Sequence, residues 1–158
     1  MNIISYESDV AAWANQQAAL IRSGQFNLLD LEHLAEEIEE VSKSEQRELA
    51  HRMAVLLMHL LKWEYQPLRR GNSWLRTIRD QRDDIKEHLD DVPSLRPKIS
   101  DEKWIRSAYR SAVAKAAKET SIDADKFPET CPWSMVDVLT DGWLPIGTAS
   151  TSAGEKVH

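Results

Sequence analysis

Apolar residues follow one another most densely from Met53 to Leu61, where His59 alone interrupts the run. A helix that is apolar on nearly every face must be surrounded by other helices, because no face of it suits contact with water. The run therefore predicts an all-α fold, a single-domain helical bundle with a helix over 44–66 at its centre.

Shorter stretches with apolar residues three and four positions apart predict the rest of the bundle. Capping residues locate several helix ends: Ser8 or Asp9 before the first stretch, Gly24 after it, Asp30 before the second and Ser73 before the fourth. The join between the second and third stretches has no clear cap, so a kink and a loop both fit it. We expect five main helices, over about 9–23, 30–41, 44–66, 73–91 and 101–120, and a short helix over 134–139.

The expected helix over 30–41 combines an apolar stripe with many glutamates. Its buried face is predicted to consist of Leu31, Leu34, Ala35, Ile38 and Val41, and its acidic residues are Glu32, Glu36, Glu37, Glu39 and Glu40. Such acidic density favours a solvated face, with a metal or magnesium–phosphate site as the alternative. The run from Glu36 to Glu40 superficially resembles the paired glutamate motif of all-α nucleotide pyrophosphatases. A helical wheel, however, directs Glu36 and Glu40 away from the apolar stripe and places Glu37 at its edge.

Composition and charge narrow the class of protein. Hydrophobic residues make up 42% of the 158 and charged residues 29%, which is ordinary globular usage. The formal net charge of -6 disfavours broad, non-specific nucleic-acid binding. The single cysteine, Cys131, permits no intramolecular disulfide, and neither a signal peptide nor a membrane-spanning run is recognisable. We expect a cytoplasmic protein with no membrane partner, a bundle domain over 1–145 and a disordered polar tail over 146–158.

His59 is the polar residue that fits its surroundings least well. A buried imidazole must be neutral or hydrogen-bonded, so the structural interpretation is a core histidine bonded to a carboxylate or carbonyl. The functional interpretation is a ligand or a proton-transfer group. Glu37 is the preferred partner, because both residues flank the apolar faces of helices that are neighbours in sequence. Lys62 and Trp63 are adjacent to His59 on the same helix.

The expected helix over 73–91 carries polar residues within its apolar stripe and a local excess of arginine. Gln81 and His88 complete the stripe and are interpreted as interior or interface residues. The arginines are Arg69, Arg70, Arg76, Arg79 and Arg82. We interpret them as a face that meets the glutamates of the 30–41 helix, within the bundle or in a second copy. The alternative is a phosphate or RNA site with Trp74 available for base stacking.

With these residues in view, the chain resembles the bacterial domain-of-unknown-function family 29 over roughly Tyr6 to Pro145. The most specific likeness is the segment from His59 to Pro67. The other matching pieces are Tyr6, Asp9 and Trp13, then 34–38, 73–82, 94–97, Phe127-Pro128, Cys131-Pro132 and Leu144-Pro145. The resemblance implies an all-α bacterial protein and no assigned activity. It also implies that Glu37, His59, Lys62, Trp63, Trp74 and Arg82 are the signature residues of the family.

Two functional hypotheses follow. The sequence has no Gly-rich phosphate loop, no His-Glu-x-x-His helix and no nucleophile elbow. We therefore expect a binding or regulatory module that forms a homo-oligomer or binds a protein partner, with no cofactor and no metal. The alternative is a metal-dependent hydrolase of a nucleotide or phosphoester, in which Glu37 and Glu40 hold the ion, His59 is base or ligand, and Arg79 or Arg82 takes phosphate. The candidate polar site comprises Glu37, Glu40, His59, Lys62, Arg79 and Arg82, and the aromatic signature comprises Trp13, Trp63 and Trp74.

Overall fold

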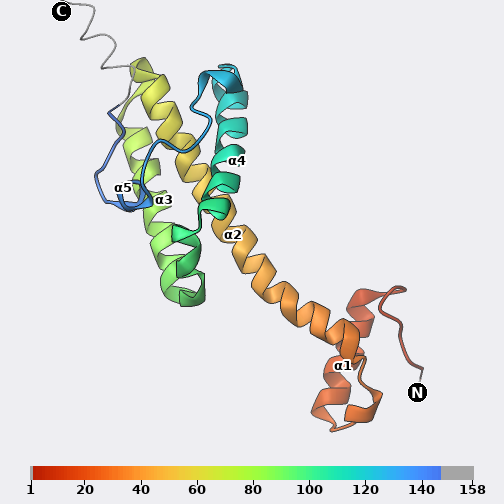
Figure 1. Cartoon of the computed structure of the whole chain (residues 1–158). Coiled ribbons are helices and arrows are strands. Elements are labelled where there is room, and N and C mark those ends of the chain that lie inside the picture. The colour runs from red at the N-terminus through yellow and green to blue at the C-terminus, as the bar shows by residue number, and fades with distance from the viewer. Residues whose placement is uncertain (1, 147–158) are drawn as a thin grey trace, which may run out of the picture. The chain divides into compact units, whose positions relative to one another are not determined.

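The computed structural model describes residues 2–146, and every regular element among them is helical (Figure 1). The α-helices are α1 (Val10–Arg22), α2 (Leu31–Tyr65), α3 (Asn72–Asp91), α4 (Glu102–Thr120) and α5 (Met135–Leu139). Short 3-10 helices connect them: η1 (Phe26–Leu28), η2 (Pro67–Arg69), η3 (Pro93–Ser100) and η4 (Ala124–Lys126). The predicted all-α class is confirmed. Among the described residues, no helix combines the length and apolar character needed to cross a membrane.

Contacts divide the chain into two compact units. The N-terminal unit comprises Met1–Glu45, and the C-terminal unit begins at Gln46. Helix α2 contributes its first part to one unit and its second part to the other. The expectation of one domain over 1–145 stays a prediction. The expected disorder of the tail falls almost entirely outside the described residues.

The N-terminal unit is organised by local capping signals and a few buried residues of α1. Asp9 is the N-cap of α1, where its side chain accepts a hydrogen bond from the Ala12 backbone N–H at 3.0 Å. The helix ends before Gly24, which adopts a φ of 75° that few other residues tolerate. Trp13, Gln17 and Leu20 form the buried face of α1. The predicted first helix is thus confirmed at both ends.

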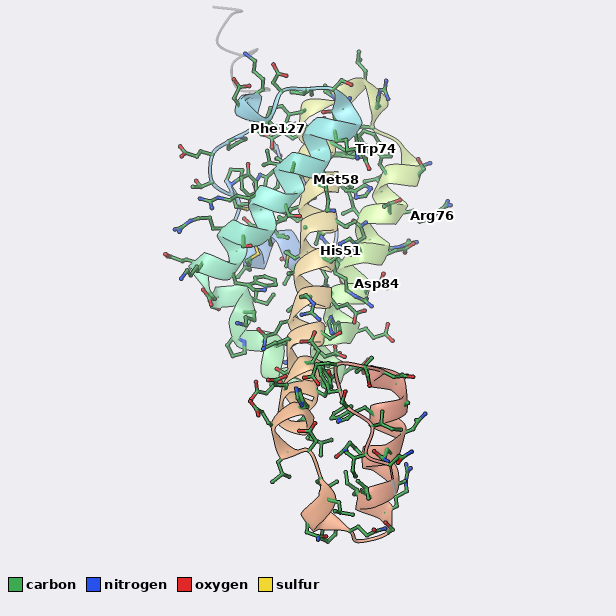
Figure 2. All side chains as sticks on the ribbon, turned by 90° about the vertical axis from the view of Figure 1, so that its right-hand side faces the viewer. His51, Met58, Trp74, Arg76, Asp84 and Phe127 are labelled. Atoms are coloured by element: carbon green, nitrogen blue, oxygen red, sulfur yellow. The ribbon has the colours of Figure 1, made fainter. Side chains whose placement is uncertain are left out.

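The C-terminal unit encloses the apolar run that dominates the sequence. In this unit, α2 lies between α3 and α4, as both views show (Figures 1 and 2). The buried side chains of α2 from Leu49 to Leu61 pack in one cluster with residues of the other helices. Those partners are Ile78, Ile85 and Leu89 of α3, Ala108, Tyr109, Ala112 and Ala116 of α4, and Phe127, Met135 and Val138. The predicted central helix is therefore confirmed.

The structure decides one open join and corrects one predicted cap. The segments expected over 30–41 and 44–66, between which a kink and a loop both fitted, form the single helix α2. No glycine or proline interrupts the sequence between them, so nothing forces the backbone to leave the helix. Ser73 is not the cap of α3, which begins at Asn72 with Gly71 as N-cap and no side-chain cap bond.

Candidate functional site

The apolar stripe at the start of α2 is exposed, contrary to prediction. Leu31, Ile38 and Val41 are 70%, 70% and 67% exposed. They occur within about 80° of one another around the helix, so they form one line, which we call the α2 stripe. The periodicity correctly identifies an apolar face on the first part of α2. Among the described residues, however, this face is not covered by other parts of the protein.

A different face of α2 packs within the N-terminal unit. Tyr6 donates a hydrogen bond from its hydroxyl to Glu37 Oε1 at 2.6 Å, and its ring stacks on that of His33 at a centroid distance of 4.2 Å. The hydrogen bond to Glu37 and burial raise the pKa of Tyr6. Glu37 was predicted as a metal ligand and as the partner of His59. Its carboxylate instead accepts the hydrogen bond from Tyr6, which fits a structural role.

Trp13, Asp30 and His33 form a second contact between α1 and the start of α2. Trp13 donates its indole N–H to Asp30 Oδ2 at 3.0 Å, and His33 Nδ1 lies 2.7 Å from the same oxygen. The hydrogen bond to Asp30 raises the pKa of His33. Burial raises the pKa of Asp30, but bonds from His33 and Trp13 outweigh it and leave that pKa below its ordinary value. Trp13 of the aromatic signature thus joins the two helices.

The first part of α2 also carries exposed glutamates. Glu32, Glu36 and Glu39 are exposed and fall within about 60° of one another around the helix, on the side turned away from the α2 stripe. Glu40, a predicted metal ligand, is half-buried in the same unit. Residues 1–45 hold nine of the 26 Asp and Glu residues but only two of the 20 Lys and Arg residues. The N-terminal unit is therefore strongly acidic, and the remainder of the chain is nearly balanced in charge.

Three predicted residues come together in the C-terminal unit. Lys62 of α2 donates a hydrogen bond to Glu119 Oε2 of α4 at 2.8 Å, and its Nζ lies 5.2 Å from the centroid of the Trp74 ring of α3. The hydrogen bond from Lys62 lowers the pKa of Glu119, and His59 lies one turn before Lys62 on α2. Glu119 was missed by sequence reasoning, because nothing near it in the chain marks it. The cluster ties three helices together through one ion pair and one cation–π contact.

His59 is satisfied by its own helix. Its Nδ1 lies 2.9 Å from the carbonyl oxygen of Val55, one turn earlier, and burial lowers its pKa, which favours the neutral ring. The predicted pair with Glu37 is wrong, because both residues belong to α2 and two residues of one helix meet only three or four positions apart. His59 thus fits the structural interpretation.

We expect the substitution His59→Leu to leave the melting temperature unchanged or to raise it slightly. The Val55 carbonyl oxygen keeps its backbone hydrogen bond in the helix, so no buried partner loses its only contact, and leucine suits the half-buried site better. Thermal melting of the purified variant checks this. A loss of about 1–3 kcal/mol would instead show that His59 satisfies a buried group.

The two predicted phosphate ligands lie one turn apart on α3 but in different surroundings. Arg79 is exposed, with its Nε 3.7 Å from Asp80 Oδ1. Arg82 is only 2% exposed, and it donates hydrogen bonds to the backbone carbonyl oxygens of Val138 and Trp143. Burial lowers the pKa of Arg82. Arg82 therefore anchors the C-terminal segment to α3.

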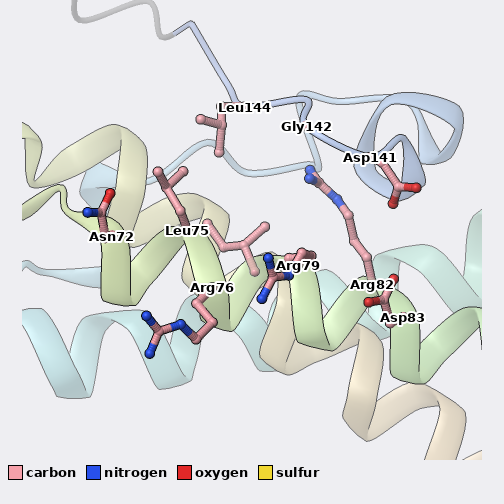
Figure 3. A pocket seen from close by; sticks show the side chains of 10 residues that line it. Asn72, Leu75, Arg76, Arg79, Arg82, Asp83, Asp141, Gly142 and Leu144 are labelled. Carbon is pink, nitrogen blue, oxygen red and sulfur yellow. The ribbon is translucent and has the colours of Figure 1, made fainter.

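Both arginines line a pocket of about 660 Å³ beside α3, which we call the α3 pocket (Figure 3). Its wall includes the apolar residues Leu75, Ile78 and Leu144, and its further charged residues are Arg76, Asp83 and Asp141. Asp141 is paired with Lys86 at 2.6 Å. Figure 3 shows the Arg82 side chain reaching from α3 toward the turn at Asp141 and Gly142.

The residues of the predicted polar set lie in three different surroundings. Glu37 and Glu40 belong to the N-terminal unit, His59 and Lys62 to the three-helix cluster, and Arg79 and Arg82 to the α3 pocket. In the aromatic signature, Trp63 contacts Arg70, whose guanidinium carbon lies 5.2 Å from the centroid of the Trp63 ring. Glu37, His59 and Lys62 thus make contacts that fit structural roles, and Arg79 is exposed at the α3 pocket.

A protein-family model described as "Domain of unknown function DUF29" matches residues 5–144. No curated protein and no solved structure gives a significant match to the chain.

Proposed function

The chain belongs to the DUF29 family, which is described as a domain of unknown function. We propose, from the residues exposed on its surface, that it is a non-enzymatic protein-binding module. The α2 stripe is its contact surface. The single observation that carries the proposal is the exposure of Leu31, Ile38 and Val41 in one line on an ordered helix.

Exposed apolar surface on this scale needs a reason. A contiguous apolar patch on a protein surface commonly marks a site that is covered by a partner. Five more exposed large apolar residues belong to the same unit: Ile3, Val10, Ile21, Phe26 and Leu28. The N-terminal unit therefore carries most of the exposed large apolar side chains of the described chain. This concentration supports a contact function for the unit.

The charge of the N-terminal unit indicates the kind of partner. With nine Asp and Glu residues against two Lys and Arg residues, the unit repels an acidic partner and attracts a basic one, while the apolar line supplies contact area. An amphipathic helix with lysine or arginine beside leucine or isoleucine satisfies both requirements. We propose a basic amphipathic helix as the bound element.

The hydrolase hypothesis gains no support from the contacts. Its two carboxylates lie in one unit and its histidine and arginines in the other. Glu37 accepts the bond from Tyr6, and Arg82 binds two backbone carbonyls.

Binding to a synthetic amphipathic peptide with leucines on one face and lysines on the other tests the proposal. We expect Ile38→Gln to weaken peptide binding about tenfold in a fluorescence anisotropy titration, because the centre of the apolar line becomes polar. The matched control is Val136→Gln, which makes the same kind of change at a 77% exposed residue of α5 and should leave binding unchanged.

A second peptide, with glutamate in place of every lysine, separates specific from general apolar binding. It should bind at least tenfold more weakly than the lysine peptide, because the acidic N-terminal unit repels an acidic peptide. Equal binding of the two peptides, or full binding by Ile38→Gln, would contradict the proposed function.

A further inference from the structure

We propose that the α3 pocket binds a small organic phosphate, a phosphate monoester with an apolar body. Every described residue that lines this pocket belongs to the C-terminal unit, so the site is contained within one compact unit. Arg76 and Arg79 bind the phosphate, and the apolar residues of the wall contact the body of the ligand. This site is a second surface of the chain and does not depend on the function proposed for the α2 stripe.

The pocket has the size and the division of polarity that such a ligand needs. Its volume of about 660 Å³ suits a small molecule. Leu75, which is 39% exposed, and the buried Ile78 form an apolar wall on α3, and Leu144 lies on the chain that passes over it (Figure 3). Arg76 and Arg79 line the same pocket from a face of α3 that is rotated by about 100° from this wall. An apolar body loses its contact with water at the leucines, while an anionic group meets the guanidinium groups.

The carboxylates of the pocket do not neutralise its exposed arginines. Within the described part of the chain, Arg76 makes no ion pair, and Arg79 has the exposed contact of its Nε with Asp80 Oδ1 at 3.7 Å. A surface pair of this kind is weak and exchanges readily for another anion. Asp141 is already paired with a lysine, which leaves Asp83 as the other carboxylate of the lining. The pocket therefore has an excess of positive charge and favours an anion.

Arg82 adds charge to the pocket although its hydrogen bonds are directed elsewhere. Its Nε and one terminal nitrogen donate to the backbone carbonyl oxygens of Val138 and Trp143, which carry no net charge and leave the positive charge of the guanidinium uncancelled. Because Arg82 is only 2% exposed, water screens this charge poorly. Arg82 therefore attracts an anion to the pocket, and the exposed arginines beside it supply the hydrogen bonds.

The two exposed arginines suit a phosphate better than a carboxylate. Arg76 and Arg79 are three positions apart on α3, so their side chains are neighbours on the helix surface. A phosphate monoester offers three strong acceptor oxygens and carries nearly two negative charges at neutral pH, so it can bind two guanidinium groups at once. A carboxylate has two oxygens, and a single guanidinium in bidentate geometry already occupies both. The geometry therefore favours a phosphate monoester over a carboxylic acid.

Titration of the ¹⁵N-labelled chain with hexyl phosphate, followed by amide chemical shifts, tests the site. We expect saturable shifts at Leu75, Arg79 and Gly142, which line the pocket, and none in α1. Inorganic phosphate lacks the apolar body and 1-hexanol lacks the anion, so each should bind at least tenfold more weakly. Hexanoate keeps the apolar body but replaces the phosphate with a carboxylate, and it should also bind at least tenfold more weakly.

Variants separate the two parts of the site. Arg76→Gln with Arg79→Gln should weaken hexyl phosphate binding at least tenfold, because both hydrogen-bonding cations are lost. Leu75→Gln should weaken hexyl phosphate but leave the weaker binding of inorganic phosphate unchanged. The matched control is Arg106→Gln with Arg110→Gln, which removes two exposed arginines of α4 and should leave binding unchanged. Circular dichroism of every variant establishes that its helices are retained.

Four outcomes would overturn the inference. The first is the absence of saturable shifts up to about 10 mM hexyl phosphate, and the second is shifts confined to residues outside the pocket. The third is equal binding of hexyl phosphate and hexanoate. The fourth is full binding by the Arg76 and Arg79 double variant, or a loss of binding in the α4 control as large as in that variant.

Discussion

Replacing Arg82 by alanine is expected to lower the free energy of unfolding of the C-terminal unit by about 3 kcal/mol. The guanidinium holds the carbonyl oxygens of Val138 and Trp143 in a site where Arg82 itself is 2% exposed. Alanine leaves these acceptors without their charged donor and opens a cavity where the long side chain lay. Urea unfolding followed by tryptophan fluorescence measures the change.

Arg79→Ala is the matched control for Arg82→Ala. Arg79 lies one turn earlier on the same helix but is exposed, and its contact with Asp80 at 3.7 Å is a surface pair. We expect its removal to change the free energy of unfolding by no more than about 0.5 kcal/mol. If the two substitutions changed the free energy of unfolding equally, Arg82 would not be a structural anchor. A role for Arg82 in binding phosphate would then be supported again.

Local signals predicted the helices well. Asp9 caps α1 by accepting a hydrogen bond from the backbone of Ala12, and Asp30 accepts one from the backbone of His33 at the start of α2. Each cap depends on a residue and its immediate neighbours, so the sequence alone is sufficient to place it. The same holds for the central position of α2, because an all-round apolar helix has no stable alternative to burial.

The exposure of the α2 stripe could not be predicted from local signals. Periodicity shows that Leu31, Ile38 and Val41 share a face, but it does not show what covers that face. Bonds such as that from Tyr6 to Glu37 decide which face of α2 turns toward α1, and they join residues far apart in the chain. Long-range pairing of this kind leaves no local pattern.

Arg82 is a different case, because a usable signal was present. It falls in helical register with Ile78, Ile85 and Leu89, all of which are buried. An arginine on a buried face must find acceptors, so its position alone indicates a structural role rather than a surface one. Glu119 offered no such signal, since its contact with Lys62 depends on how α4 packs against α2.

Replacing Trp13 by alanine is expected to unfold the N-terminal unit while the C-terminal unit stays folded. Trp13 is 2% exposed, its indole N–H bonds Asp30, and its ring meets that of Tyr6 edge-on at 4.9 Å. Loss of a buried tryptophan costs about 3–5 kcal/mol. A unit of this size has little stability to lose, because a short chain buries too little surface.

Hydrogen exchange read by mass spectrometry resolves the two units in one experiment on Trp13→Ala. We expect α1 to lose its amide protection and α3 and α4 to keep theirs, since the cluster that includes Ile85 and Ala112 contains no residue of the N-terminal unit. Val10→Ala, at a 51% exposed position of α1, should change neither. If α3 and α4 lost protection together with α1, the chain would unfold as one cooperative domain over 1–145.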